Sequence, residues 1–335
     1  MRQLAIVAVG AMLMATSTPP IRSEDAATAQ TTMRIVQGQR YGTGDGRSML
    51  SRAAAVAESA DGALYVLDPG LNKVVVFNRD GTLRRLVAIG MGRGPGELEA
   101  PRSIALSDEG ELIVLDGRAG RAVVLDTIGQ LKRTLTLGVP ALLSVSAIGN
   151  RLYTTRLVIP PTDAAVLIYD LQGTRRGESF VPSLEERDFA RAGNGHRIAQ
   201  LQDGNLVVAA LNPGSWSLLA NSGRRFGRAL VADNRVIKLA RSSAVSALAL
   251  TSGFAAMADG RVLVFYVTHD PTYFQRRDAA SAHNRVAVFR ADGSLVGTLA
   301  LADSVGTFVA SSRDGRELYF QVTEPFPQLV RCRVE

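Results

Sequence analysis

The chain of 335 residues holds a single cysteine, Cys332, so it cannot form a disulfide within itself. Aromatic residues are also scarce, because Phe, Trp and Tyr together make up 6% of the sequence. Hydrophobic residues nevertheless reach 46% and charged residues 21%, a balance typical of a chain that buries a sizeable core. The packing of aliphatic side chains, rather than cross-links, must therefore stabilise the fold.

Long apolar runs are missing as well. No stretch reaches the roughly 18 apolar residues of a membrane-spanning helix, so we expect no membrane span in the mature chain. The apolar segment Leu4–Met14 is shorter and follows Met1-Arg2-Gln3, an arrangement typical of a secretory signal peptide. We predict a signal peptide over residues 1–17, with cleavage after Ser17 or as late as Ala29. The protein is then exported, to the periplasm or the extracellular space.

Lysine is rare, and arginine carries almost all of the formal net charge of +7. Among 38 basic residues only three are lysines, namely Lys73, Lys132 and Lys238. Basic residues do not form runs interleaved with aromatic ones, which argues against nucleic acid as a partner. We interpret the arginines mainly as a solvated surface, with attraction toward acidic partners as the alternative.

What the sequence does contain is a repeat. Shifting the chain by 48 residues aligns nearly a hundred residues without a gap. The shift superimposes glycines, aliphatic residues and an aspartate: Gly62 on Gly110, Leu64 on Leu112, Val66 on Val114, Asp68 on Asp116 and Gly81 on Gly129. Such self-similarity is the signature of a fold that stacks one structural unit several times.

Each unit indicates four short strands joined by tight turns. In the second unit we expect strands over residues 103–106, 111–115, 122–126 and 131–137, with turns at Gly110 and Gly129. Short strands joined by Asp-Gly-like turns form antiparallel hairpins. Because no helical periodicity lies between them, four antiparallel strands per repeat predict one blade of a β-propeller.

The turns also predict the number of blades. The first turn of the unit recurs at Gly149-Asn150, Asp203-Gly204, Asp259-Gly260 and Asp314-Gly315. With the two aligned units this makes six, so we expect an all-β, six-bladed β-propeller over residues 33–335. The last unit has three strands, and the segment 33–40 aligns with an outer strand of the repeat. We therefore expect the N-terminal strand to complete the last blade and close the ring, which removes exposed sheet edges.

The segment 90–101, Gly-Met-Gly-Arg-Gly-Pro-Gly-Glu-Leu-Glu-Ala-Pro, is followed by Ile104-Ala105, Gly110 and Asp116. These residues resemble an NHL repeat of the six-bladed propeller group. The resemblance implies the propeller fold. It does not imply one activity, because that group includes interaction domains, lyases and lactonases.

Long and variable loops lie on one face of the predicted propeller, opposite the tight turns. The longest covers residues 268–284, and such loops on a rigid frame commonly carry recognition. Guanidinium groups bind carboxylate or phosphate in a bidentate manner. We therefore expect a ligand, anionic if the arginines converge, at Arg93, Arg118, Arg156, Tyr273, Arg276 and Arg277.

All three histidines also map to this face. His196, His269 and His283 with Asp270 form a reasonable ligand set for a divalent metal such as zinc. Some six-bladed lyases and hydrolases hold a metal in the channel through residues of the inner strands. This chain departs from them, because only His196 opens an inner strand and no matching acidic residues accompany it. A solvated surface position is the common alternative for such histidines, and we predict no cofactor.

No catalytic signature is present, and we favour a protein that is not an enzyme. The preferred hypothesis is an exported binding propeller, expected as a monomer, whose variable-loop face recognises a protein, peptide or glycan. One alternative is a metal-dependent hydrolase or lyase with its site at the mouth of the central channel. Another is a purely structural component of an envelope assembly.

Overall fold

The computed structural model divides the chain into two compact units, residues 1–31 and 32–335. The residues described belong to the second unit: 34–44, 46–156, 165–179, 196–200, 206–210, 215–219, 225–230, 249–269, 282–290, 294–301 and 305–335. The expected signal peptide and most of the 268–284 loop lie outside this part of the chain. Within the described part, no helix is long and apolar enough to cross a bilayer.

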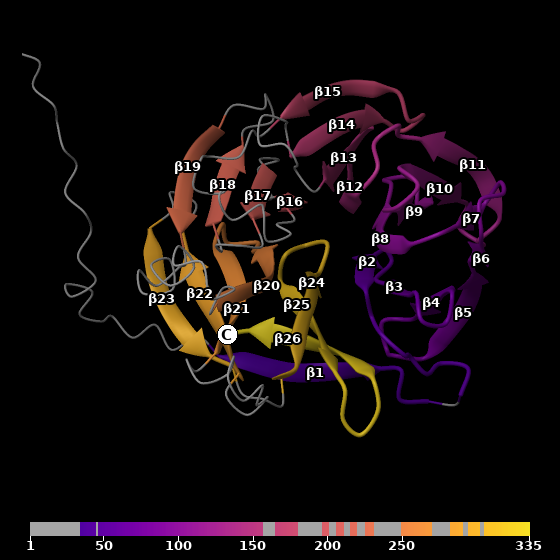
Figure 1. Cartoon of the computed structure of the whole chain (residues 1–335). Helices are drawn as coiled ribbons and strands as arrows, with labels where there is room; N and C mark the ends of the chain where they lie inside the picture. The colour runs from indigo at the N-terminus through magenta and orange to yellow at the C-terminus, as the bar shows by residue number, and fades with distance from the viewer. Residues whose placement is uncertain are drawn as a thin grey trace, which may run out of the picture. The chain divides into compact units, whose positions relative to one another are not determined.

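Three antiparallel four-stranded sheets follow one another in the first part of this unit (Figure 1). The first contains β2 (Ala55–Glu58), β3 (Leu64–Asp68), β4 (Lys73–Phe77) and β5 (Leu83–Ala88). The second contains β8 (Pro101–Leu106), β9 (Leu112–Asp116), β10 (Arg121–Leu125) and β11 (Leu131–Thr136). The third contains β12 (Leu142–Ile148), β13 (Arg151–Arg156), β14 (Val166–Asp170) and β15 (Arg175–Ser179).

The remaining strands form three further four-stranded sheets. One contains β16 (His196–Gln200), β17 (Leu206–Ala210), β18 (Ser215–Leu219) and β19 (Arg225–Leu230). The next contains β20 (Ala249–Ala256), β21 (Val262–His269), β22 (Ala282–Phe289) and β23 (Leu295–Ala300). The last joins β24 (Thr307–Ser311), β25 (Glu317–Val322) and β26 (Gln328–Val334) to β1 (Ile35–Tyr41). Below, each sheet is named after its innermost strand. The sheet of strands β2–β5, for example, is the β2 blade.

The first strand of each sheet contacts the first strand of the next. These contacts run from β2 to β8, β12, β16, β20 and β24, and from β24 back to β2. Figure 1 shows the corresponding radial arrangement of the sheets within this unit. The described part of the chain is therefore an all-β propeller.

The expected count of six complete blades requires correction. Five blades are described with packed side chains, namely the β2, β8, β12, β20 and β24 blades. The strands β16–β19 pair as a further four-stranded sheet, but in that sheet only Ile198 and Val208 have described side chains. The count is thus corrected to five blades with described packing, plus the β16 sheet, known from its backbone pairing. The number of blades expected from the sequence was too high because turn residues predict hairpins but carry no information on how a sheet packs.

Aliphatic side chains fill the seams between neighbouring blades. Leu67, Val76 and Val114 are fully buried between the β2 and β8 blades. Ile113 and Leu167 belong to the corresponding cluster between the β8 and β12 blades. This agrees with the low aromatic content, since most of each seam is built from Val, Leu, Ile and Ala.

The N-terminal strand completes the β24 blade, as predicted. β1 pairs antiparallel with β26, with Ile35 opposite Val334 and Tyr41 opposite Leu329. Tyr41 is 1% exposed, and its ring packs edge-on against Phe77 of the β2 blade at a centroid distance of 5.6 Å. The strand therefore closes the last sheet and also ties it to the first.

The 48-residue repeat is visible residue by residue. β3 and β9 are fully buried along their whole length and occupy equivalent positions. β9 begins at Leu112 instead of the expected 111 because Glu111 belongs to the turn, where its backbone N–H donates to Ser107 Oγ at 3.1 Å. One element was not expected: β6 (Gly90–Met91) and β7 (Glu97–Leu98) form a short parallel pair in the connection before β8.

Candidate functional site

Two buried aspartates hold the loops of the variable face in place. Asp68 ends β3, and its carboxylate accepts backbone N–H groups from Ser51 at 2.6 Å and from Gly70 at 3.1 Å. One repeat later, the Asp116 carboxylate accepts the backbone N–H groups of Glu99 at 2.7 Å and Arg118 at 3.2 Å. Each aspartate therefore fastens the segment that enters its blade to the loop between the second and third strands.

These hydrogen bonds also lower the pKa of Asp116. Its burial by itself raises the pKa, because desolvation disfavours a charged carboxylate. Hydrogen bonds from the backbone N–H groups of Glu99, Ala119, Ala100 and Arg118 outweigh that effect, so the net pKa is lowered. The carboxylate stays ionised and accepts hydrogen bonds across the physiological range.

The connection between the β2 and β8 blades is an ordered loop. Arg121 donates from Nη2 to the carbonyl oxygens of Gly92 at 2.8 Å and Glu97 at 2.7 Å. Gly92 has a φ of 145°, and a Cβ there would lie 2.2 Å from a carboxylate oxygen of Glu97, which explains the need for glycine. Arg121 is thus a structural anchor of this loop.

The expected ligand-binding arginines are only partly within the described residues. Arg93 lies in this loop with its side chain 80% exposed, and its Nε is 2.7 Å from Glu99 Oε1. Arg118 is exposed in the β9–β10 loop, and Arg156 is half-buried at the end of β13. All three positions lie on the variable face. Arg118 and Arg156 lie where the second strand of a blade ends, and Arg93 lies in the connection that precedes the first strand of a blade. Tyr273, Arg276 and Arg277 lie outside the described residues, so convergence of the set stays a prediction.

The expected metal ligands are described only by their backbone or not at all. His196 pairs with Ala210 at the start of β16, and His283 pairs with Thr268 next to His269 in the β21–β22 ladder. Asp270 lies outside the described residues. Elsewhere in the described part of the chain, no group of three His, Cys, Asp or Glu side chains is placed to hold a metal. The metal site stays a prediction.

The centre of the propeller encloses a cavity of about 900 Å³. The described strands β2, β8, β12, β16, β20 and β24 all contribute to its wall. Half of the lining residues are small or carry hydroxyls, such as Ala55, Ser103, Ser144, Ala147 and Ser311. Small side chains on the innermost strands leave this space open instead of filling it.

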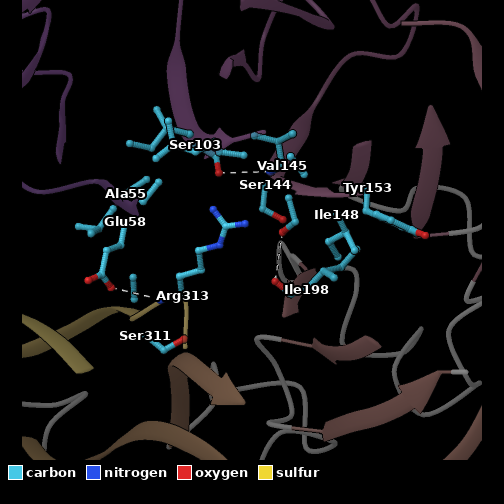
Figure 2. A pocket seen from close by; sticks show the side chains of 18 of the residues that line it. Ala55, Glu58, Ser103, Ser144, Val145, Ile148, Tyr153, Ile198, Ser311 and Arg313 are labelled. Carbon is cyan, nitrogen blue, oxygen red and sulfur yellow. Dashed lines mark hydrogen bonds between the residues drawn. The ribbon is translucent and has the colours of Figure 1, made fainter. Parts of the chain in front are cut away.

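Charged residues line the cavity at the end where the first and second strands turn. They are Glu58 at the end of β2, Asp108 after β8, Arg151 at the start of β13 and Arg313 after β24. Figure 2 shows the Arg313 side chain extending into the cavity between Glu58 and Ser144. Arg313 Nη2 donates to Asp108 Oδ1 at 2.7 Å, and its backbone N–H donates to Glu58 Oε2 at 3.3 Å.

The same turn sets the positions of Asp108 and Arg313. In both blades a serine begins the turn and a glycine closes it: the Gly110 N–H donates to the Ser107 carbonyl, and the Gly315 N–H to the Ser312 carbonyl, both at 3.0 Å. Ser312 Oγ also accepts the N–H of Glu317 at 2.9 Å. Asp108 and Arg313, which each follow the serine, are therefore held at equivalent places at the edge of the cavity.

Glu58 lies at the border between this site and the core. Burial raises its pKa above the ordinary value, and the hydroxyl of Tyr319 donates to it. Tyr319 is itself 1% exposed, and burial raises its pKa too. Glu58 thus fixes the backbone of Arg313 to the seam between the β24 and β2 blades.

Sequence reasoning missed this charged end of the cavity because it searched the variable face. The tight turns were used only for counting blades. The signal was present, since Ser107-Asp108-Glu109-Gly110 and Ser312-Arg313-Asp314-Gly315 share a pattern with opposite charges at the second position.

Comparisons with known proteins support the fold. No family model matches the chain, and no curated protein matches it. Solved structures that resemble it are propellers with low sequence identity. A member of the DUF4221 family from Bacteroides vulgatus is 12% identical, with a TM-score of 0.64 over 90% of this chain and 98% of that one. A putative exported protein from Bacteroides fragilis is 11% identical, with a TM-score of 0.60 over 92% of this chain and 97% of that one.

Virginiamycin B lyase from Staphylococcus aureus, solved with quinupristin, is also similar. It is 11% identical, with a TM-score of 0.56 over 90% of this chain and 99% of that one. At such identities the similarity concerns the fold alone. The resemblance of the first two repeats to NHL repeats accordingly stays a prediction, while the β-propeller is shown.

Proposed function

We propose that the protein is an exported binding propeller whose variable-loop face recognises a protein, peptide or glycan. The observation that carries this proposal is the pair of aspartate clamps, Asp68 and Asp116. They hold loops of the face in fixed positions through backbone hydrogen bonds. A surface of fixed loops binds without first ordering itself, which favours recognition.

The composition of the face supports a partner with anionic and apolar groups. Met49, Leu71 and Met91 are 40%, 45% and 46% exposed on the loops of the β2 and β8 blades. Their loops adjoin one another, since Ser51 bonds to Asp68 and the Ile89 N–H donates to the Asn72 carbonyl at 2.9 Å. The exposed Arg93 and Arg118 add positive charge. Methionine is a common residue of adaptable binding surfaces.

Export rests on the N-terminal sequence. One similar structure is described as a putative exported protein, which agrees with this part of the proposal. N-terminal sequencing of the mature protein from a cell fractionation tests it. Export predicts a start at Thr18 or, for late cleavage, at Gln30, in the periplasmic or extracellular fraction. An intact Met1 in the cytoplasmic fraction would exclude export.

The binding proposal is tested with the purified mature protein on peptide and glycan arrays. We expect a double Arg93→Gln and Arg118→Gln variant to lose about tenfold in affinity for the ligands that the wild type selects, because both guanidinium groups are exposed on the face. Arg175→Gln is the matched control, since Arg175 forms an exposed ion pair with Glu178 on the outer strand β15. Equal binding by the double variant and the wild type would refute the role of this surface.

A chimera addresses the longest loop. Replacing residues 270–281, between the paired strands β21 and β22, by a short turn removes Tyr273, Arg276 and Arg277 and keeps the strands. If the loop takes part in recognition, the same array ligands are lost or change. Unchanged binding would restrict the site to the loops of the β2 and β8 blades.

A further inference from the structure

The cavity has a charged end that the proposed function does not use. Arg313 reaches across this end from the β24 blade to Asp108 of the β8 blade and passes the intervening β2 blade. In the equivalent turns of the β2 and β20 blades, the position of Arg313 is taken by Ala60 and Ala258. The long side chain is therefore not needed to form the turn.

Arg313 has hydrogen-bonding capacity that the described residues leave unused. Of its side-chain nitrogens only Nη2 has a partner, Asp108, while Nε and Nη1 have none among the described residues. Arg151 lines the same end of the cavity and has no side-chain partner among these residues either. Two guanidinium groups with unused donors at one cavity can bind an anion, because the planar fork matches a carboxylate.

The Arg313–Asp108 pair is weak enough to yield to a ligand. The two side chains are 47% and 62% exposed, and exposed ion pairs contribute little to stability because water and salt screen them. A carboxylate that enters the cavity therefore competes with Asp108 on nearly equal terms. Asp108 and Glu58 together disfavour a dianion at this place, so a singly charged carboxylate fits better than a phosphate monoester.

The cavity wall indicates what the rest of the ligand is like. Beyond the charged end, Ala55, Ala57, Val145, Ala147 and Ala310 provide apolar surface, and Ser144 and Ser146 provide hydroxyls. A volume of about 900 Å³ is within the range that small-molecule sites occupy, about 300–1,000 Å³. An apolar chain of several carbons can lie against this wall while its carboxylate meets the arginines.

We propose that the central cavity binds a small amphipathic monocarboxylate, with its carboxylate held by Arg313 and Arg151 and its apolar part along the innermost strands. The ligand displaces Asp108 from Arg313. This site lies on the tight-turn face and is independent of the binding surface on the variable face.

Isothermal titration of the mature protein with octanoate tests this proposal, with octanamide as the uncharged probe of the same shape. We expect saturable octanoate binding with a dissociation constant below about 1 mM and at least about tenfold weaker binding of octanamide. Arg313→Gln should weaken octanoate binding about tenfold. Arg175→Gln, in an exposed ion pair on the outer strand β15, should leave it unchanged.

Asp108→Asn gives the sharpest result. It removes the competitor for Arg313, so octanoate should bind severalfold more tightly, whereas a purely structural role of the ion pair predicts weaker binding or none. Thermal melting of each variant shows that it is folded. Absence of octanoate binding, equal binding of octanamide, or no gain in the Asp108→Asn variant would overturn the proposal. None of these results would affect the array test of the variable face.

Discussion

Arg313 and Asp108 are 205 residues apart in the sequence, yet Arg313 Nη2 lies 2.7 Å from Asp108 Oδ1. The contact depends on the ring of sheets, because the two residues occupy equivalent turns of blades on either side of the β2 blade. It marks the end of the cavity that faces the tight turns. The aspartate clamps Asp68 and Asp116 mark the opposite, variable face, so the molecule has two different surfaces at which binding can be tested.

The clamp at Asp116 should be essential for stability. Asp116→Asn replaces a carboxylate oxygen by an NH₂ group facing backbone N–H donors, which leaves buried groups unsatisfied. We expect the free energy of unfolding to fall by about 2–3 kcal/mol, measured by urea denaturation. Asp68→Asn should behave alike, because Asp68 has equivalent partners. The control Asp80→Asn lies in an exposed turn and should leave stability unchanged. A stable Asp116→Asn variant would show that the clamp does not hold the loops.

Stability should fall with acid through Glu111. The hydrogen bond from Arg133, together with the contact to Lys132, lowers the pKa of this buried carboxyl from 4.5 to about 2. A group whose folded pKa is depressed stabilises the fold above its unfolded pKa, and this contribution is lost as pH falls through the folded value. The free energy of unfolding should therefore decrease between pH 4.5 and about 2.

Glu111→Gln supplies the matched control for that titration. The variant lacks the ionisable group, so it should be less stable at neutral pH, and its decline between pH 4.5 and about 2 should be shallower. Parallel pH profiles for the variant and the wild type would contradict this role of Glu111.

Tyr41 should couple the last blade to the first. Tyr41→Ala leaves a cavity beside Phe77 and Tyr319, whose rings lie 5.6 and 6.4 Å from that of Tyr41. We expect a loss of about 3 kcal/mol in the free energy of unfolding, as is usual for truncation of a buried aromatic ring. Arg34→Ala, an exposed position of the same segment, should have little effect. If both variants had the same free energy of unfolding, the N-terminal strand would not contribute to packing of the core.

The metal alternative has a direct measurement. If His196, His269, Asp270 and His283 hold a divalent ion, protein purified without chelator should contain close to one equivalent by elemental analysis. The binding-propeller proposal expects less than about one-tenth of an equivalent of zinc or calcium. A stoichiometric metal that is lost in a His269→Ala variant would favour the hydrolase or lyase instead.

Much of the fold could be predicted from the sequence because its repeat acts locally. The alignment of Asp68 with Asp116 and of Gly62 with Gly110 fixed strand positions to within about two residues, since turns and short strands depend on nearby residues. The closing of the last sheet by the N-terminal strand followed from the same register. What failed was the number of complete blades, because turn residues carry no information on whether a sheet packs side chains against its neighbours.

The site was harder to predict, because it depends on residues far apart in the chain. The variable face was deduced from loop length, but loop length does not show which arginines are free to bind a ligand: Arg121 donates to backbone carbonyl groups of this face. The Arg313–Asp108 contact required the closed ring, and only coordinates place two turns from different repeats side by side. Composition could not distinguish these arginines from the others on the surface.

The whole account depends on closure of the propeller by the N-terminal strand, and the single cysteine allows a direct test. Gln37 lies opposite Cys332 in the β1–β26 ladder. Burial raises the pKa of the Cys332 thiol to about 12, so the folded protein contains little reactive thiolate. The Gln37→Cys variant is therefore oxidised during refolding in a glutathione buffer. We predict that Gln37→Cys then has no free thiol in a thiol titration, whereas the neighbouring Val36→Cys, opposite Arg333, keeps both. Two free thiols in each variant would contradict the closed ring.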